Sequence, residues 1–207
     1  MKIGIIGSGK FGLVLARIAA ENGNQVSIYS RREAEVESLN QKKQSLSGFS
    51  FTEYEILATS DPSDLNQCEV LLITVASKDF KEVIEKINYK SQKGKFVSCV
   101  KGFDTNTGKL MTEVLIDDFN IESKDVFVLS GPNLSKELDN RELTGTVIAG
   151  EDQNFINSLC NALKTEYFIP CRNTDRYGVE LGKEKKNVYA ILSGYFHKKG
   201  VGENTIG

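Results

Sequence analysis

Short apolar runs alternate with longer amphipathic stretches along most of this 207-residue chain. Continuous apolar runs are typical of parallel strands buried on both faces, whereas apolar residues three and four apart predict helices. The runs that predict strands cover residues 3–6, 25–29, 55–59, 69–75, 96–100, 126–129, 147–149 and 167–169. The longer helical patterns cover residues 33–41, 79–87, 107–115 and 154–163, after a first helix that follows residue 12. This alternation predicts an α/β fold with a doubly wound, Rossmann-type sheet.

The pattern changes after residue 173, where one longer helix is predicted. Asp175 is placed to cap it. Its apolar positions include Val179, Val188, Ile191, Leu192 and Tyr195. No strand pattern follows, and the apolar face of this helix has no predicted partner. We therefore expect a dinucleotide-binding domain over residues 1–172 and, over residues 173–207, the first helix of an all-helical second domain that is cut short.

Three glycines follow the first apolar run with the spacing G-x-G-x-x-G. In a dinucleotide site, Gly7 would permit the tight turn, Gly9 would let the backbone approach a pyrophosphate, and Gly12 would let the next helix pack closely. The start of that helix offers free N–H groups to phosphates. A glycine-rich structural turn is the alternative, but the strand before and the helix after supply the context that the motif requires.

The end of the second predicted strand bears on the choice of cofactor. An NAD-specific fold usually carries Asp or Glu there, to hold the ribose hydroxyls. This chain has Ser30, Arg31 and Arg32 instead. A carboxylate would repel a 2′-phosphate, whereas a guanidinium can bind it in a fork. The sequence therefore favours NADP(H) over NAD(H), with the alternative that one or both arginines begin the next helix in solvent.

Composition and charge narrow the class of protein. A formal net charge of −2 gives no reason to expect nucleic acid or a membrane surface. No stretch approaches the ~18 consecutive apolar residues of a membrane helix, and the N-terminus is strand and phosphate loop rather than a signal peptide. The four cysteines have no C-x-x-C spacing. We expect reduced thiols in a cytoplasmic protein, with no metal site.

Lysines at two further positions are candidate binding or catalytic residues. Lys101 directly follows an apolar strand, at the sheet edge where open α/β folds bind ligands. It could hold a phosphate, polarise a carbonyl or lie in solvent. Lys186 and Asn187 lie between apolar neighbours on the long helix, and a lysine in a dry cleft can act as general acid or base. Lys183 and Asn187 share one face of that helix, although a solvated helix face explains such a cluster equally well. We expect four segments to meet at the sheet edge: residues 7–12, 74–77, 101–102 and 130–135.

Five motifs together resemble the glycerol-3-phosphate dehydrogenases that use NAD(P). They are GSGKFG at 7–12, YSRR at 29–32, VKGFD at 100–104, LSGPNLSKE at 129–137 and YGVELGKEKKNVYAI at 177–191. The resemblance covers the N-terminal two-thirds of that family. It implies interconversion of dihydroxyacetone phosphate and sn-glycerol 3-phosphate, for phospholipid synthesis. The sequence does not decide whether the full-length protein forms a homodimer.

The resemblance also implies roles for individual residues. The cofactor-binding positions would be Gly7, Gly9, Lys10, Phe11, Gly12, Arg31, Arg32, Lys101 and Ser135. The substrate-binding positions would be Lys101, Gly131, Asn133, Lys186 and Asn187. Lys186 matches the proton acceptor, and Lys101 matches a lysine that contacts both substrate and cofactor, so these two are the expected catalytic residues. Asn133 stands where serine is usual, and residues 183–185 read Lys-Glu-Lys where the family has Gly-Ala-Leu.

Two other functions stay open at this stage. Another NADP-linked 3-hydroxyacid dehydrogenase is one, because such enzymes also use the spacing of Lys183 and Asn187 on their interdomain helix. A non-catalytic nucleotide-binding module is the other, because the resembling family continues well beyond residue 207. We expect this chain, as a fragment, to bind cofactor and to catalyse weakly or not at all.

Overall fold

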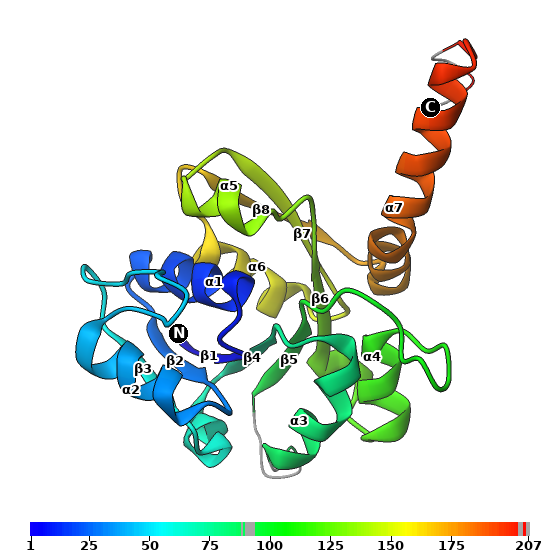
Figure 1. Cartoon of the computed structure of the whole chain (residues 1–207). Helices are drawn as coiled ribbons and strands as arrows, with labels where there is room; N and C mark the ends of the chain where they lie inside the picture. Colours follow the sequence, from blue (N-terminus) through cyan, green and yellow to red (C-terminus); the bar gives the residue numbers. More distant parts are fainter. Residues whose placement is uncertain (88, 90–93, 203–204, 206–207) are drawn as a thin grey trace.

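The computed structural model describes residues 1–87, 89, 94–202 and 205. Its strands form one sheet in the order β3-β2-β1-β4-β5-β6-β7-β8 (Figure 1). The strands are β1 (Lys2–Ile6), β2 (Gln25–Tyr29), β3 (Ile56–Thr59), β4 (Val70–Ile73), β5 (Lys95–Ser98), β6 (Val126–Ser130), β7 (Thr144–Ala149) and β8 (Phe168–Asn173). The α-helices are α1 (Lys10–Glu21), α2 (Glu33–Lys42), α3 (Phe80–Lys86), α4 (Met111–Glu113), α5 (Ser135–Asp139), α6 (Gln153–Leu163) and α7 (Arg176–Lys198).

Strand β1 lies where the strand order reverses. It pairs in parallel with β2 on one side and with β4 on the other. The pairs β2–β3, β4–β5 and β5–β6 are also parallel. Ligands in open α/β sheets bind beyond the carboxyl ends of the strands at such a reversal point. The glycine turn after β1 therefore lies where this fold places its binding crevice.

Alternate strand residues enter two hydrophobic cores, one on each face of the sheet. Ile5 packs in the cluster that includes Leu13 of α1, and Ile6 packs in the cluster that includes Phe80 of α3. Figure 1 shows α1 and α6 on one face of the sheet and α3 and α4 on the other. Because both faces are covered, the strands read as continuous apolar runs. The predicted doubly wound α/β fold is confirmed.

Two local predictions differ from the structure. The helix predicted over residues 107–115 begins only at Met111, because Gly108 takes a positive φ of 71° in a turn and the Glu113 carboxylate accepts the Leu110 N–H at 2.8 Å. Strand β7 begins at Thr144, earlier than predicted, and runs antiparallel to β6. A short apolar run fixes the existence of a strand but carries no signal for its direction.

Helix α7 begins against the sheet and then extends away from it (Figure 1). Asp175 caps it, with its carboxylate accepting the Gly178 N–H at 2.8 Å, as predicted. One turn later the buried Glu180 carboxylate accepts hydrogen bonds from the N–H and hydroxyl of Thr112. The second half is open to solvent, with Ile191 72% exposed. Among the described residues, no helix has the length and apolar character needed to cross a membrane.

The Glu180 anchor makes the stability of the chain depend on pH. Burial raises the pKa of the Glu180 carboxyl, against the opposing effect of the Thr112 hydrogen bonds. An acid with a raised folded-state pKa lowers the free energy of unfolding at neutral pH, and this penalty fades as pH falls through the folded-state pKa. Relative to Glu180→Gln, the parent chain should therefore gain stability as the pH falls from neutral toward 4.5, the ordinary pKa of a glutamate carboxyl. Urea unfolding at several pH values measures this difference.

The matched control is Glu85→Gln, at an exposed position on α3. Its difference from the parent should stay flat over the same range. A flat difference for Glu180→Gln would contradict the role given to the buried carboxyl.

Candidate functional site

Glycine has a different geometric role at each of the three positions in the turn after β1. Gly7 takes a positive φ of 113° and donates its N–H to the Tyr29 carbonyl at 3.0 Å. A Cβ at Gly12 would lie 2.2 Å from the Gly7 carbonyl oxygen, which excludes any side chain there. A Cβ at Gly9 would meet no atom within 4 Å. The backbone at Gly9 is thus open to a ligand, while Gly7 and Gly12 hold the turn against α1.

Helix α1 directs its N-terminus at this open space. Its cap is Gly9, so no side chain occupies the capping position. The first-turn N–H groups of a helix have no partner within the helix. Together with the helix dipole, they favour an anion such as a diphosphate.

Two neighbouring cavities lie along the sheet edge. We call the first the arginine cavity; it measures about 340 Å³. It is lined by Gly7, Ser8, Gly9, Tyr29, Ser30, Arg31, Arg32, Thr74, Val75, Ala76, Asp79 and Val83. The second, the lysine cavity, measures about 310 Å³. It is lined by Phe11, Thr74, Val75, Ala76, Cys99, Val100, Lys101, Leu129, Ser130, Gly131, Asn133, Ser135 and Lys183. The four segments predicted to meet at this edge do meet there, and residues 74–76 belong to both cavities.

The two arginine side chains differ in how firmly they are held. The Arg31 guanidinium lies 3.7 Å from an Asp79 carboxylate oxygen, and its side chain is 64% exposed. Arg32 lies 3.4 Å from Glu35 and is 59% exposed. An exposed ion pair as long as that of Arg31 is weak, so the Arg31 guanidinium stays available to a phosphate at the mouth of the cavity. Arg32 instead pairs with a Glu35 carboxylate that is only 1% exposed, which holds Arg32 more firmly.

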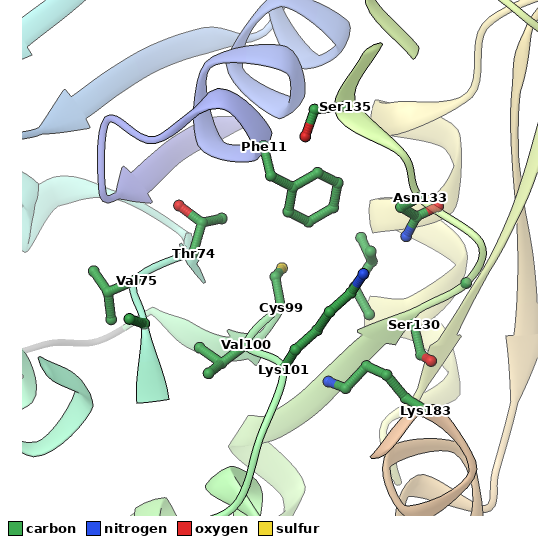
Figure 2. A pocket seen from close by; sticks show the side chains of 13 residues that line it. Phe11, Thr74, Val75, Cys99, Val100, Lys101, Ser130, Asn133, Ser135 and Lys183 are labelled. Atoms are coloured by element: carbon green, nitrogen blue, oxygen red, sulfur yellow. The ribbon is translucent and has the colours of Figure 1, made fainter. Parts of the chain in front are cut away.

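The lysine cavity combines apolar walls with a few polar atoms (Figure 2). The ring of Phe11 projects from α1 toward it. Asn133 is buried, and its amide nitrogen donates to the Thr146 hydroxyl at 3.1 Å, while its Oδ1 has no hydrogen-bond partner among the described residues. Burial raises the pKa of the Cys99 thiol to about 12. Cys99 therefore stays protonated and is no nucleophile.

Lysines enter the lysine cavity from two elements. Lys101 follows β5, and Lys183 lies on α7; Figure 2 shows both side chains reaching into the space. The Lys183 side chain is only 5% exposed, and burial lowers its pKa. The sequence singled out Lys183 only through its spacing from Asn187, and Lys183 was not among the expected site residues. Its spacing on one helix face was the available signal, but that spacing cannot tell which turn of the helix lies against the sheet.

Four of the expected site residues do not line either cavity or cannot be placed. Gly12 is buried behind the glycine turn, against the Gly7 carbonyl. Lys10 is exposed and lines a separate space of about 240 Å³ with Lys136 and Asp139. Lys186 is exposed on α7 and does not line the lysine cavity. It lies three residues after Lys183, so the two share a helix face one turn apart. The side chain of Asn187 lies outside the described residues.

Comparisons with known proteins point to one family. Residues 2–156 match the family described as NAD-dependent glycerol-3-phosphate dehydrogenase N-terminus. A curated relative from Alcanivorax borkumensis, named an NAD(P)+ glycerol-3-phosphate dehydrogenase, is 35% identical over 97% of this chain and 59% of its own length. A relative of the same name from Corynebacterium aurimucosum is 34% identical over 99% of this chain and 63% of its own.

Solved structures give the same picture. The glycerol-3-phosphate dehydrogenase of Coxiella burnetii superposes with a TM-score of 0.79 and 26% identity, over 99% of this chain and 63% of that one. The enzyme of Plasmodium falciparum superposes with a TM-score of 0.83 and 23% identity, over 100% of this chain and 61% of that one. At this identity the likeness supports the fold alone. This chain thus spans about three-fifths of the length of these relatives. The resemblance noted in the sequence is confirmed: the chain belongs to the NAD-dependent glycerol-3-phosphate dehydrogenase family.

Proposed function

We propose that this chain forms the cofactor-binding part of an NADP(H)-dependent enzyme that interconverts dihydroxyacetone phosphate and sn-glycerol 3-phosphate. One observation carries the proposal: the arginine and lysine cavities share residues 74–76, so an elongated dinucleotide would reach from Arg31 to Lys101 past the glycine turn. The substrate is inferred from the names of the relatives, about three-fifths of whose length this chain spans. The product would serve phospholipid synthesis in the cytoplasm.

The residues present fit a dinucleotide of this kind. NADP(H), when bound, supplies or accepts the hydride. Gly9 leaves the backbone free of any obstructing side chain, and the N-terminus of α1 would hold the diphosphate. Arg31 and Arg32 would hold the 2′-phosphate of the adenosine end. Phe11 and Ser135, which line the lysine cavity, would flank the nicotinamide end.

The substrate end would be served by lysines. Lys101 would stabilise the negative charge that develops on the substrate oxygen, or hold the nearby phosphate. Lys186 would supply the proton to the forming alkoxide and take it back in the reverse direction. Gly131 and Asn133 would contact the substrate from the segment after β6, and Asn187 from α7.

A second candidate function has one observation in its favour. The spacing of Lys183 and Asn187 also occurs in NADP-linked 3-hydroxyacid dehydrogenases, and here Lys183 lines the cavity whereas Lys186 is exposed. In that case Lys183 would be the proton-transferring amine. The two functions differ in substrate, so a direct comparison of dihydroxyacetone phosphate with a 3-hydroxy acid separates them.

The affinities for NADPH and NADH test whether Arg31 in the arginine cavity binds the 2′-phosphate. Arg31→Ala should weaken NADPH binding roughly tenfold, because a charge-assisted hydrogen bond to the 2′-phosphate is worth about 1.5–3 kcal/mol and this one is partly screened by solvent. NADH binding should change less than about twofold, because NADH lacks that phosphate. Titration of cofactor fluorescence with the 207-residue chain measures both affinities.

Arg172→Ala is the matched control for this titration. Arg172 is exposed on β8, bonds to Asn157 and lies outside both cavities. Its NADPH affinity should equal that of the parent. Equal losses of NADPH and NADH affinity in Arg31→Ala would remove the argument for NADP(H).

Single-turnover rates test the catalytic roles proposed for Lys101 and Lys186. In single-turnover reactions with excess chain, dihydroxyacetone phosphate should drive slow oxidation of NADPH. Lys101→Met and Lys186→Met should each lower that rate about 100-fold or more, the usual contribution of a charge-stabilising or proton-transferring group. Loss of NADPH absorbance and formation of sn-glycerol 3-phosphate, detected by mass spectrometry, are the measurements.

Lys198→Met, in the last turn of α7, serves as the control and should react like the parent. Faster reduction of NADP+ by 3-hydroxybutyrate, with the rate depending on Lys183 rather than Lys186, would favour the second candidate. NADPH binding without reaction on either substrate would favour a nucleotide-binding module.

A further inference from the structure

Residues 183–184 place a charged pair on α7 where the family pattern reads Gly-Ala. The Lys183 side chain is 5% exposed and the Glu184 side chain 7% exposed, and Lys183 Nζ lies 3.8 Å from Glu184 Oε1. Burial lowers the pKa of Lys183, and the carboxylates of Glu180 and Glu184 oppose that shift. Lys183 is therefore the counter-ion of two buried carboxylates. Because a buried ion pair adds little stability compared with apolar residues of the same volume, the pair calls for another role.

The second oxygen of Glu184 holds the loop after β5. Glu184 Oε2 accepts the N–H of Gly102. Among the hydrogen bonds of the described residues, it is the only one that the backbone of residues 101–102 makes. Gly102 takes a positive φ of 115°, and a Cβ there would lie 3.0 Å from Ser77 Oγ. The loop thus makes a turn that favours glycine, and Glu184 is the group that holds it.

This bond acts on Lys101 through the backbone. The Gly102 N–H belongs to the planar peptide unit that follows Lys101, so holding the N–H restricts the ψ angle of Lys101. On the other side, the Cys99 N–H donates to the Ile73 carbonyl at 3.0 Å. The chain is thus held both before and after Lys101, whose side chain reaches into the lysine cavity (Figure 2).

We propose that Glu184 is a positioning residue: its carboxylate, paired with Lys183, holds the peptide between Lys101 and Gly102 so that the Lys101 side chain stays in the lysine cavity. The proposal rests on the proposed function and deepens it, because it names the group that orients the charge-stabilising lysine. A chain with Gly-Ala at these two positions has neither the acceptor nor its counter-ion. The device therefore belongs to this chain rather than to the family pattern.

Amide hydrogen exchange of Gly102, measured by NMR on the 207-residue chain, tests the tether without any need for activity. The Gly102 N–H should exchange slowly in the parent and about tenfold or more faster in Glu184→Ala, as expected for the loss of a charge-assisted hydrogen bond. Glu184→Gln keeps an acceptor oxygen and should retain most of the protection. Glu85→Ala, at an exposed position on α3, is the control and should exchange like the parent.

A double variant, Lys183→Met with Glu184→Ala, covers the case in which Glu184→Ala alone does not fold. Removing both partners of a buried ion pair together is often neutral for stability, whereas removing one leaves a buried charge. The double variant should lose the protection of the Gly102 N–H. In its crystal structure, the Lys101 side chain should have left the position that it holds in a crystal structure of the parent.

A double-mutant cycle tests whether Glu184 acts through Lys101. In the single-turnover reaction with dihydroxyacetone phosphate, Glu184→Ala should lower the rate of NADPH oxidation roughly tenfold, because a displaced catalytic group reacts more slowly. In a Lys101→Met background the same substitution should change the rate less than about twofold, because the residue on which it acts is gone. Glu184→Gln should keep most of the rate.

Fast exchange of the Gly102 N–H in the parent would overturn the tether, and this result needs no variant. An unmoved Lys101 in the crystal structure of the double variant, or equal rate losses from Glu184→Ala in both backgrounds, would overturn the positioning role. Absence of any reaction by the parent would contradict the proposed function instead, because hydrogen exchange and the crystal structures decide the placement of Lys101 independently.

Discussion

The close approach of α1 to the turn after β1 fixes the rest of the site. Gly12 lies so near the Gly7 carbonyl that no Cβ fits between them. The Thr74 hydroxyl donates to the carbonyl oxygens of Ile6 at 2.9 Å and Gly7 at 3.1 Å, which ties the segment after β4 to the same turn. Thr74 also lines both cavities. One backbone contact thus sets where the helix N-terminus points and where the wall between the cavities stands.

Much of this arrangement could be predicted from local patterns. Apolar runs gave the strands, and the glycine spacing gave the turn, because both depend on neighbours close in sequence. The reversed direction of β7 could not be predicted, since antiparallel and parallel pairing bury the same short run of residues. The position of Lys183 in the lysine cavity could not be predicted for a related reason. Helix periodicity places Lys183 and Lys186 on one face, but only the tertiary packing of α7 decides which turn meets the sheet.

The start of α7 joins anchoring and site chemistry in one cluster. Glu180 and Glu184 attach the helix to Thr112 and Gly102. Burying these carboxyl groups has a cost, visible in the raised pKa of Glu180. The attachment fixes the helix rotation that turns Lys183 toward the cavity. A more apolar anchor would hold α7 equally well, but it would not surround a buried amine with charges that compensate it.

The arginine cavity places a guanidinium and a carboxylate side by side, and the two would have opposite effects on the choice of cofactor in the proposed site. In the proposed cofactor site, Arg31 would favour a 2′-phosphate, whereas the Asp79 carboxylate in the same cavity would suit ribose hydroxyls and repel a phosphate. The 3.7 Å separation between them is too long for a hydrogen bond, so Arg31 can turn to a phosphate without breaking a strong contact. Asp79 would then stay partly exposed, where an unpaired carboxylate costs little. Discrimination between the two cofactors therefore rests on the difference between two solvent-screened interactions, and it should weaken as ionic strength rises.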